Sequence, residues 1–148
     1  MPRKQTIADL VRDGRLERIQ GDTTEARDLL EHASKHLASA IAIVDDDPAG
    51  AYQLVYDAAR KATAADMAAN GYRAKSDRPG AHAAVVAYAE EALAGDAEPT
   101  ALANFDQMRR SRNRSEYGGV TLSAAQVKAD LESARAIVDG VRKRGGAW

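Results

Sequence analysis

The sequence predicts an all-α fold, an antiparallel four-helix bundle with additional short helices. Apolar residues recur at steps of three and four over four long segments, which is the period of a helix with one buried face. Alanine is very common and only four prolines occur in 148 residues, a composition that favours helix over sheet. Alternating β-branched runs, which a strand-rich fold needs, are missing. Because the connections are short, we expect neighbouring helices to run antiparallel.

Composition narrows the possible functions. The chain has the length of one domain and is only 5% aromatic, so small aliphatic side chains must fill its core. A net charge of −1 gives no overall attraction to nucleic acid, so such binding would need a local basic patch. The absence of cysteine excludes disulfides and thiolate chemistry. No apolar run could span a bilayer and no signal-peptide pattern opens the chain, so we expect a cytoplasmic protein without membrane contact.

The first 21 residues are expected to form a helical arm, separate from the bundle. Apolar residues lie on one face of the segment from Gln5 to Gln20, and Gly14 should break or kink it. These apolar residues are Ile7, Leu10, Val11, Leu16 and Ile19. The arm could pack either on the bundle or on a second subunit.

The predicted bundle spans residues 22–144 and begins with a helix that runs to about Val44. Asp22 should cap this helix, because Glu25 follows three residues later in a capping-box arrangement. The predicted buried face consists of Leu30, Ala33, Leu37, Ala40, Ile41 and Val44.

The second helix should begin with Asp47 as its cap and Pro48 in its first turn. It should end near Asn70, because Gly71 can adopt the left-handed conformation that stops a helix. Its predicted buried face consists of Tyr52, Val55, Tyr56, Ala59, Thr63 and Met67. Asp57 lies one turn before Arg60 and is a candidate ion-pair partner for an arginine.

Three helices are expected in the second half of the chain, after a basic loop over residues 72–80. They should cover residues 81–93, residues 100–115 and a last segment that Ser123 caps together with Gln126. The last helix carries a regular apolar seam of Val127, Leu131, Ala134, Val138 and Val141. The chain from Arg142 onward is basic and contains glycine, so we expect it to fray and residues 145–148 to form a flexible tail.

An arginine-rich stretch near the end of the fourth predicted helix carries the strongest functional signal. Arg109, Arg110, Arg112 and Arg114 fall within six positions, before Tyr117 and a glycine pair that must end the helix. The apolar stripe of this helix (Ala101, Phe105, Met108) next reaches Arg112. An inward-facing arginine needs a carboxylate, a phosphate or a water-filled cleft. The stretch indicates a basic cleft for a phosphate-bearing partner; the alternative is an exposed, charged helix end.

Histidines offer two further candidate sites. His32 and His36 lie one turn apart, a spacing used by helical metal ligands, but the sequence signals no third ligand. We therefore expect a structural or solvent-facing pair, and neither a metal nor a cofactor. His82 lies near the start of its helix, where it is either a hydrogen-bonding residue of the helix end or part of a polar cleft.

Four stretches follow one another along the chain. They are the helix segment Ala51–Lys61, Gly71-Tyr72-Arg73, Gly80-Ala81-His82, and Arg112-Asn113 with Glu116-Tyr117. Together they resemble the HEPN domain family, particularly the small single-domain members of its actinobacterial branch. The resemblance covers residues 22–143.

This resemblance implies a homodimer in which the arginine motifs of two subunits meet in a cleft. Active members are metal-independent ribonucleases, and many are toxins neutralised by a nucleotidyltransferase-type antitoxin. Their motif pairs an arginine with a histidine a few positions later. If Arg112 starts the motif, Tyr117 takes the histidine position; if Arg110 does, Ser115 takes it and Tyr117 matches a tyrosine of one toxin branch. The motif is degenerate, because neither register contains a histidine.

We therefore expect an HEPN-like protein that binds RNA or a nucleotide, in a toxin–antitoxin or defence setting. Arg112 would hold the phosphate, Asn113 would orient the substrate, and Tyr117 would stack or donate a hydrogen bond; these three are also the candidate catalytic residues. Arg109, Arg110 and Arg114 would add electrostatic attraction to Arg112. Two alternatives stay open: a metal-independent ribonuclease with an altered motif, and a non-enzymatic helical bundle that binds another protein.

Overall fold

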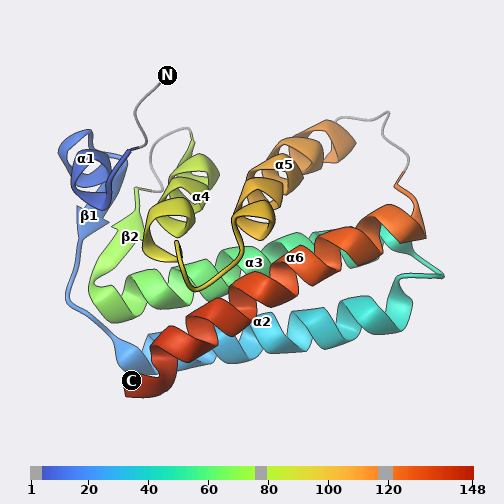
Figure 1. Ribbon diagram of the computed structural model, residues 1–148, viewed down its shortest axis with the longest axis horizontal. Helices are drawn as coiled ribbons and strands as arrows, with labels where there is room; N and C mark the ends of the chain where they lie inside the picture. Colours follow the sequence, from blue (N-terminus) through green and yellow to red (C-terminus); the bar gives the residue numbers. More distant parts are fainter. Residues whose placement is uncertain (1–4, 76–79, 117–121) are drawn as a thin grey trace.

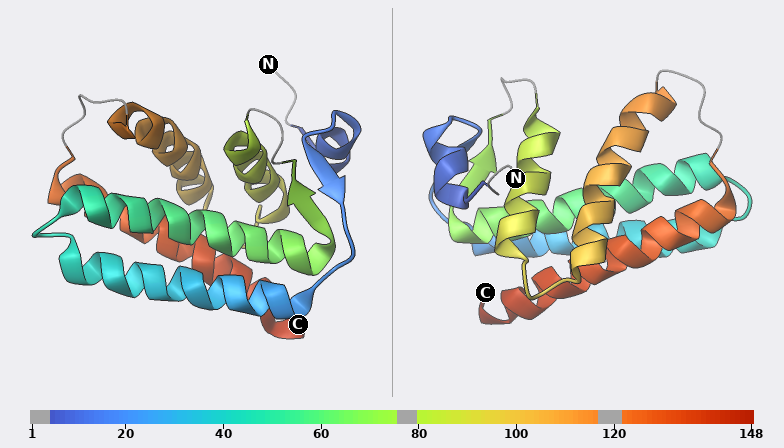
Figure 2. Two further views of the ribbon diagram at one scale, coloured as in Figure 1. Left: turned by 180° about the vertical axis from the view of Figure 1, so that it is seen from behind. Right: turned by 45° about the horizontal axis from the view of Figure 1, so that its top comes forward.

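Three long helices pack against one another and form one side of the molecule, the lower side in Figure 1. They are α2 (Thr23–Ile43), α3 (Pro48–Asn70) and α6 (Ala124–Arg144). The computed structural model describes residues 5–75, 80–116 and 122–148. Helix α3 is central, because it also contacts α4 (Ala81–Ala92) and α5 (Pro99–Glu116). These two helices lie together on one side of the long helices (Figure 2). The prediction of a mostly helical bundle is confirmed.

Local signals set the helix ends as predicted. Asp22, Asp47 and Ser123 are the N-caps of α2, α3 and α6. The side chain of each accepts a hydrogen bond from the backbone N–H three residues later, at 3.0–3.1 Å. Gly71 ends α3 in the left-handed conformation, with φ of +84°.

The arm before α2 differs from the expected helix. Only α1 (Ile7–Arg12) is helical; after a left-handed Gly14, β1 (Leu16–Arg18) pairs antiparallel with β2 (Tyr72–Ala74), which lies in the predicted basic loop. Contacts between side chains support this pairing: the Arg73 guanidinium forms an ion pair with Glu17, and the Arg18 guanidinium lies 5.3 Å from the centre of the Tyr72 ring.

The predicted apolar faces form the core with one exception. All six residues assigned to α3 and all five of the α6 seam are buried. On α2, however, Ile41 is 51% exposed, so its assignment to the buried face is wrong. The inward face of α2 continues instead from Leu37 through Ala40 to Val44, and Ile41 is rotated about 100° from Ala40. Among the described residues, no helix is both long and apolar enough to cross a membrane.

A buried ion pair ties the end of α6 to α3. The Asp66 side chain is fully buried and accepts hydrogen bonds from Arg144 Nε at 2.7 Å and from Tyr88 Oη at 2.7 Å. The hydrogen bond to Asp66 raises the pKa of Arg144. Arg144 belongs to the segment expected to fray, yet it lies in an ordered helix. The residues expected to form a flexible tail are a short 3-10 turn, Gly145–Ala147, and a partly buried Trp148 that contacts the core.

Candidate functional site

Side chains from α3, α4 and α5 meet around Tyr56. The tyrosine is fully buried on α3, and its hydroxyl lies 2.9 Å from Nδ1 of His82 on α4. The two rings stack, with centres 5.8 Å apart and an interplanar angle of 27°. The Arg112 guanidinium of α5 lies 5.4 Å from the centre of the same tyrosine ring, a cation–π distance. The ring therefore contacts both the arginine and the histidine that the sequence analysis marked as functional candidates.

Buried contacts hold this part of α5 against α3. The hydroxyl of Tyr52 donates a hydrogen bond to the backbone carbonyl of Met108. The ring centres of Phe105 and Tyr56 lie 6.0 Å apart. Both Phe105 and Met108 are buried, as the apolar stripe predicted. Arg112 lies one turn after Met108 and is half-buried. The prediction that Arg112 continues the inward stripe is confirmed.

The environment of His82 favours its neutral form. Burial lowers the pKa of the imidazole, and the positive charges of Arg60, Arg112 and Arg109 lower it further, whereas Asp57 raises it. A neutral imidazole has one nitrogen that donates a hydrogen bond and one that accepts, so at neutral pH His82 can do both.

Tyr56 keeps its proton in the same environment. Burial raises its pKa to about 12, although Arg112, Arg60 and Arg109 oppose this shift. The same three guanidinium groups thus lower the pKa values of both the histidine and the tyrosine. We call Arg60, Arg109 and Arg112, together with Tyr56 and His82, the arginine cluster.

Arg60 and Arg109 of the cluster, together with the neighbouring Arg110, outnumber their described acidic partners. Arg60 pairs with Asp57 at 3.4 Å, whereas Arg109 and Arg110 share Asp106, at 2.9 and 2.8 Å. The Arg110 side chain is 61% exposed, so it points to solvent rather than toward Tyr56. Among the described ion pairs, these three guanidinium groups therefore share two carboxylates.

Only some of the predicted site residues belong to the part of the chain that the structure describes. The structure places Arg109 and Arg112 near Tyr56 and His82 and leaves Arg110 at the surface. The side chains of Asn113 and Arg114, and all of Tyr117, lie outside the described residues. Sequence reasoning treated Tyr56 as core and Arg60 only as a possible ion-pair member. Their separation by one helical turn, which puts them on the same side of α3, was the available signal.

The other two histidines lie apart from the cluster. His32 is exposed, and His36 Nε2 lies 2.7 Å from Lys61 Nζ. Burial and the charge of Lys61 lower the pKa of His36, which suits a neutral ring that accepts a hydrogen bond from an ammonium group. Within the described part of the chain, no group of three or more histidine and acidic side chains is placed to hold a metal ion.

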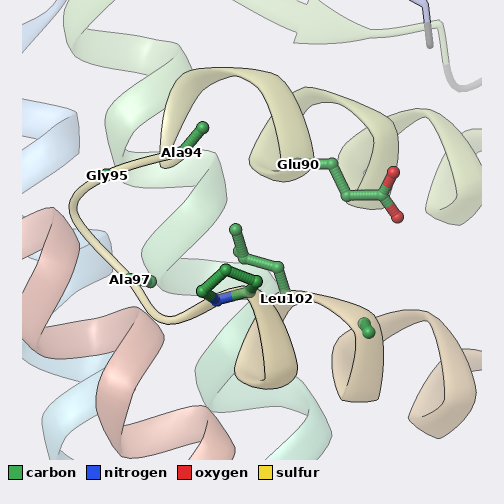
Figure 3. A pocket seen from close by; sticks show the side chains of 7 residues that line it. Glu90, Ala94, Gly95, Ala97 and Leu102 are labelled. Atoms are coloured by element: carbon green, nitrogen blue, oxygen red, sulfur yellow. The ribbon is translucent and has the colours of Figure 1, made fainter.

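A separate cavity of about 330 Å³ lies between the end of α4 and the start of α5 (Figure 3). Small and apolar residues line most of it, and Glu90 is its only charged lining residue. The cavity is at the opposite ends of these helices from His82 and Arg112. Its composition does not suit a phosphate group, so the arginine cluster is the better candidate for an anion.

The cluster has the chemistry of an anion site. Planar guanidinium groups bind phosphate oxygens through two parallel hydrogen bonds, and a neutral imidazole beside them can exchange a proton with a bound ligand. Comparison of the chain with models of known protein families, with curated proteins and with solved structures finds no match. The site itself is therefore the basis for inferring a function.

Proposed function

We propose that the protein binds RNA or a nucleotide, with a phosphate group held at the arginine cluster. The observation that carries this proposal is the convergence of Arg112 and His82 on the Tyr56 ring, with Arg60 and Arg109 beside them. Phosphate contacts from several arginines give an affinity that falls as salt rises. The Tyr56 ring is fully buried, so its part is to position Arg112 and His82 rather than to stack on a base.

The proposal includes an antiparallel four-helix architecture of the HEPN type and assembly into a homodimer. Two features support it: the helical bundle around α3, and the place of Arg112-Asn113 near the end of α5. In a dimer of this type the arginines of two subunits would face one shared cleft. We further propose a toxin–antitoxin or defence setting, with a nucleotidyltransferase-type partner.

Filter binding of single-stranded RNA at one fixed, low salt concentration tests the role of Arg112. Arg112→Lys should weaken binding about tenfold or more, because a compact ammonium cannot replace a planar two-point donor. Arg110→Lys is the matched control on the same helix, since that exposed side chain should contribute only diffuse attraction. Circular dichroism should show unchanged helix content in both variants.

Three results would contradict this proposal. Equal, small losses of affinity from both substitutions would mean a diffuse basic surface without a specific phosphate site. A lower melting temperature for Arg112→Lys with unchanged RNA binding would mean that Arg112 is structural. If the unsubstituted protein retains no RNA or nucleotide even at low salt, the remaining candidate is a bundle that binds another protein.

A second candidate function is metal-independent RNA cleavage, which the position of His82 beside Tyr56 and Arg112 favours. If Nδ1–H donates to the Tyr56 hydroxyl, Nε2 is free to accept the proton of a ribose 2′-hydroxyl. The 2′-oxygen then bonds to the adjacent phosphorus, and the bond from phosphorus to the 5′-oxygen breaks. That oxygen takes a proton from water, and the protonated His82 returns its proton to the hydroxide left behind. Arg112 would stabilise the charge that develops on the phosphate oxygens.

RNA degradation in the presence of a chelator tests this second function. His82→Gln should abolish cleavage while RNA binding stays close to that of the unsubstituted protein. Arg110→Lys should leave cleavage almost unchanged. Cleavage that survives His82→Gln, or that disappears with the chelator, would exclude the mechanism.

A further inference from the structure

A cavity of about 260 Å³ lies directly beside the arginine cluster. Arg60 lines it and also belongs to the cluster, because its charge acts on both His82 and Tyr56. On α4, the lining residue Val85 is one turn from His82. The cavity and the cluster are therefore neighbouring parts of one surface, formed where α3 and α4 meet.

The walls of this cavity are apolar, and its polar groups are few. Helices α2, α3 and α4, strand β2 and the residue after β1 supply the walls. The apolar lining includes Ile19, Leu29, Met67 and Val85. Tyr72 adds an aromatic side chain. The charged groups are two arginines, Arg60 and Arg73, and one carboxylate, Glu25.

This combination suits a nucleobase. A base has two flat, weakly polar faces that stack on apolar, aromatic or guanidinium surfaces, and a polar edge that forms hydrogen bonds. Small-molecule sites generally combine an apolar lining with a few polar groups that fix orientation. The cavity has this composition, and the cluster beside it has the groups that a phosphate needs.

We propose that the cavity is the base subsite of the nucleotide bound at the arginine cluster, and that it takes guanine. This inference rests on the proposed function. The Watson–Crick edge of guanine presents adjacent N–H donors, which the two oxygens of Glu25 can accept. Its O6 and N7 accept hydrogen bonds from a guanidinium, a role that Arg73 or Arg60 can fill.

Recruiting Arg73 costs little. The side chain is 64% exposed in its ion pair with Glu17, and exposed pairs of this kind contribute little to stability. Adenine offers a donor next to an acceptor on the same edge, so a carboxylate can satisfy only half of it. The pairing of one carboxylate with two arginines therefore distinguishes guanine from adenine.

Calorimetric titration with 5′-GMP, 5′-AMP and ribose 5-phosphate tests the subsite. We expect 5′-GMP to bind about tenfold or more tightly than ribose 5-phosphate, which has no base, and more tightly than 5′-AMP. Ala64→Leu, which fills the cavity from α3, should reduce the affinity for 5′-GMP to that for ribose 5-phosphate. Ala129→Leu, on the exposed face of α6, is the matched control and should change nothing.

Glu25→Gln provides a second variant that leaves the fold intact, because the residue is exposed and its role in the helix start is through its backbone. It should remove the preference for 5′-GMP over 5′-AMP. Equal binding of 5′-GMP and ribose 5-phosphate, or full 5′-GMP affinity in Ala64→Leu, would overturn the subsite. Equal binding of 5′-GMP and 5′-AMP would overturn the choice of guanine.

The two proposals fail in different ways in this experiment. If ribose 5-phosphate binds and Arg112→Lys weakens it, while the base adds nothing, the phosphate site stands and the base subsite is wrong. If ribose 5-phosphate, the nucleotides and single-stranded RNA all fail to bind, the proposed function fails and the base subsite fails with it.

Discussion

Asp66 is a fully buried carboxylate whose main positive partner is Arg144, from the end of α6. Removing one member of a buried ion pair leaves the other charge without compensation, at a cost of about 3–5 kcal/mol. We therefore expect Arg144→Met to lower the free energy of unfolding by about 3 kcal/mol or more, measured by urea denaturation.

Arg142→Met is the matched control for Arg144→Met. Arg142 lies two residues earlier and pairs with Asp139 at the surface, where both side chains are more than half exposed. Its replacement should cost less than about 1 kcal/mol. Equal effects of the two substitutions would mean that the pair with Asp66 contributes no more than a surface contact.

The pH dependence of stability should reveal the lowered pKa of His82. The pKa of His82 in the folded protein lies below the ordinary value of 6.5, which we take for the unfolded chain. At a pH between these two pKa values, the unfolded state binds more protons than the folded state. Stability that His82 contributes above pH 6.5 is therefore lost as the pH falls toward the folded-state pKa. We expect the melting temperature to fall as the pH is lowered from 7 to 5. This fall should be steeper in the unsubstituted protein than in His82→Gln.

NMR titration measures the same effect directly. The imidazole resonances of His82 should titrate below pH 6.5. Arg60→Gln should move the midpoint upward, because among the charged neighbours Arg60 lowers the pKa of His82 most. An unchanged midpoint in Arg60→Gln would show that the charge of Arg60 does not act on His82.

Only some of these residue-scale features could be predicted from the sequence. The inward position of Arg112 followed from the period of one helix, which is local information. The contacts between Asp66 and Arg144 and between Tyr56 and His82 join residues 78 and 26 positions apart. No spacing rule connects them, because they depend on how helices pack in three dimensions.

At the scale of a helix, the two sides of the bundle should respond differently to truncation. Leu131 is 4% exposed on the α6 seam, so Leu131→Ala should cost about 2–5 kcal/mol in lost burial and cavity formation. Ile41→Ala, on the exposed side of α2, should change the free energy of unfolding by no more than about 0.5 kcal/mol. A urea midpoint that Leu131→Ala leaves unchanged would show that α6 presents a different face to the core.

Helix ends were predictable and the strand pair was not. The starts of α2, α3 and α6 were marked by capping residues, and these helices also carry a repeating apolar face. Both signals are local in the sequence. Strands β1 and β2 contain three residues each and pair across a long separation in the chain. Such short segments carry no alternating pattern, so only the folded context specifies them.

For the whole molecule, the sequence was sufficient to predict a helical bundle, because composition and period agree over most of the chain. The proposed homodimer is a separate prediction at this scale. Light scattering at tens of micromolar (an order-of-magnitude choice) should give twice the mass of one chain. A single-chain mass at that concentration would count against a cleft shared by two subunits.

The pairing of Asp66 with Arg144 also constrains the order in which the protein can fold during translation. Arg144 leaves the ribosome 78 residues after Asp66, so α3 is complete well before its counter-ion exists. Until then the Asp66 carboxylate lacks its main counter-ion and must stay hydrated, which keeps its end of α3 from packing as it does when Arg144 is present. Ribosome-bound chains arrested before Arg144 should therefore remain open to proteases near Asp66, and release of the full chain should close that region.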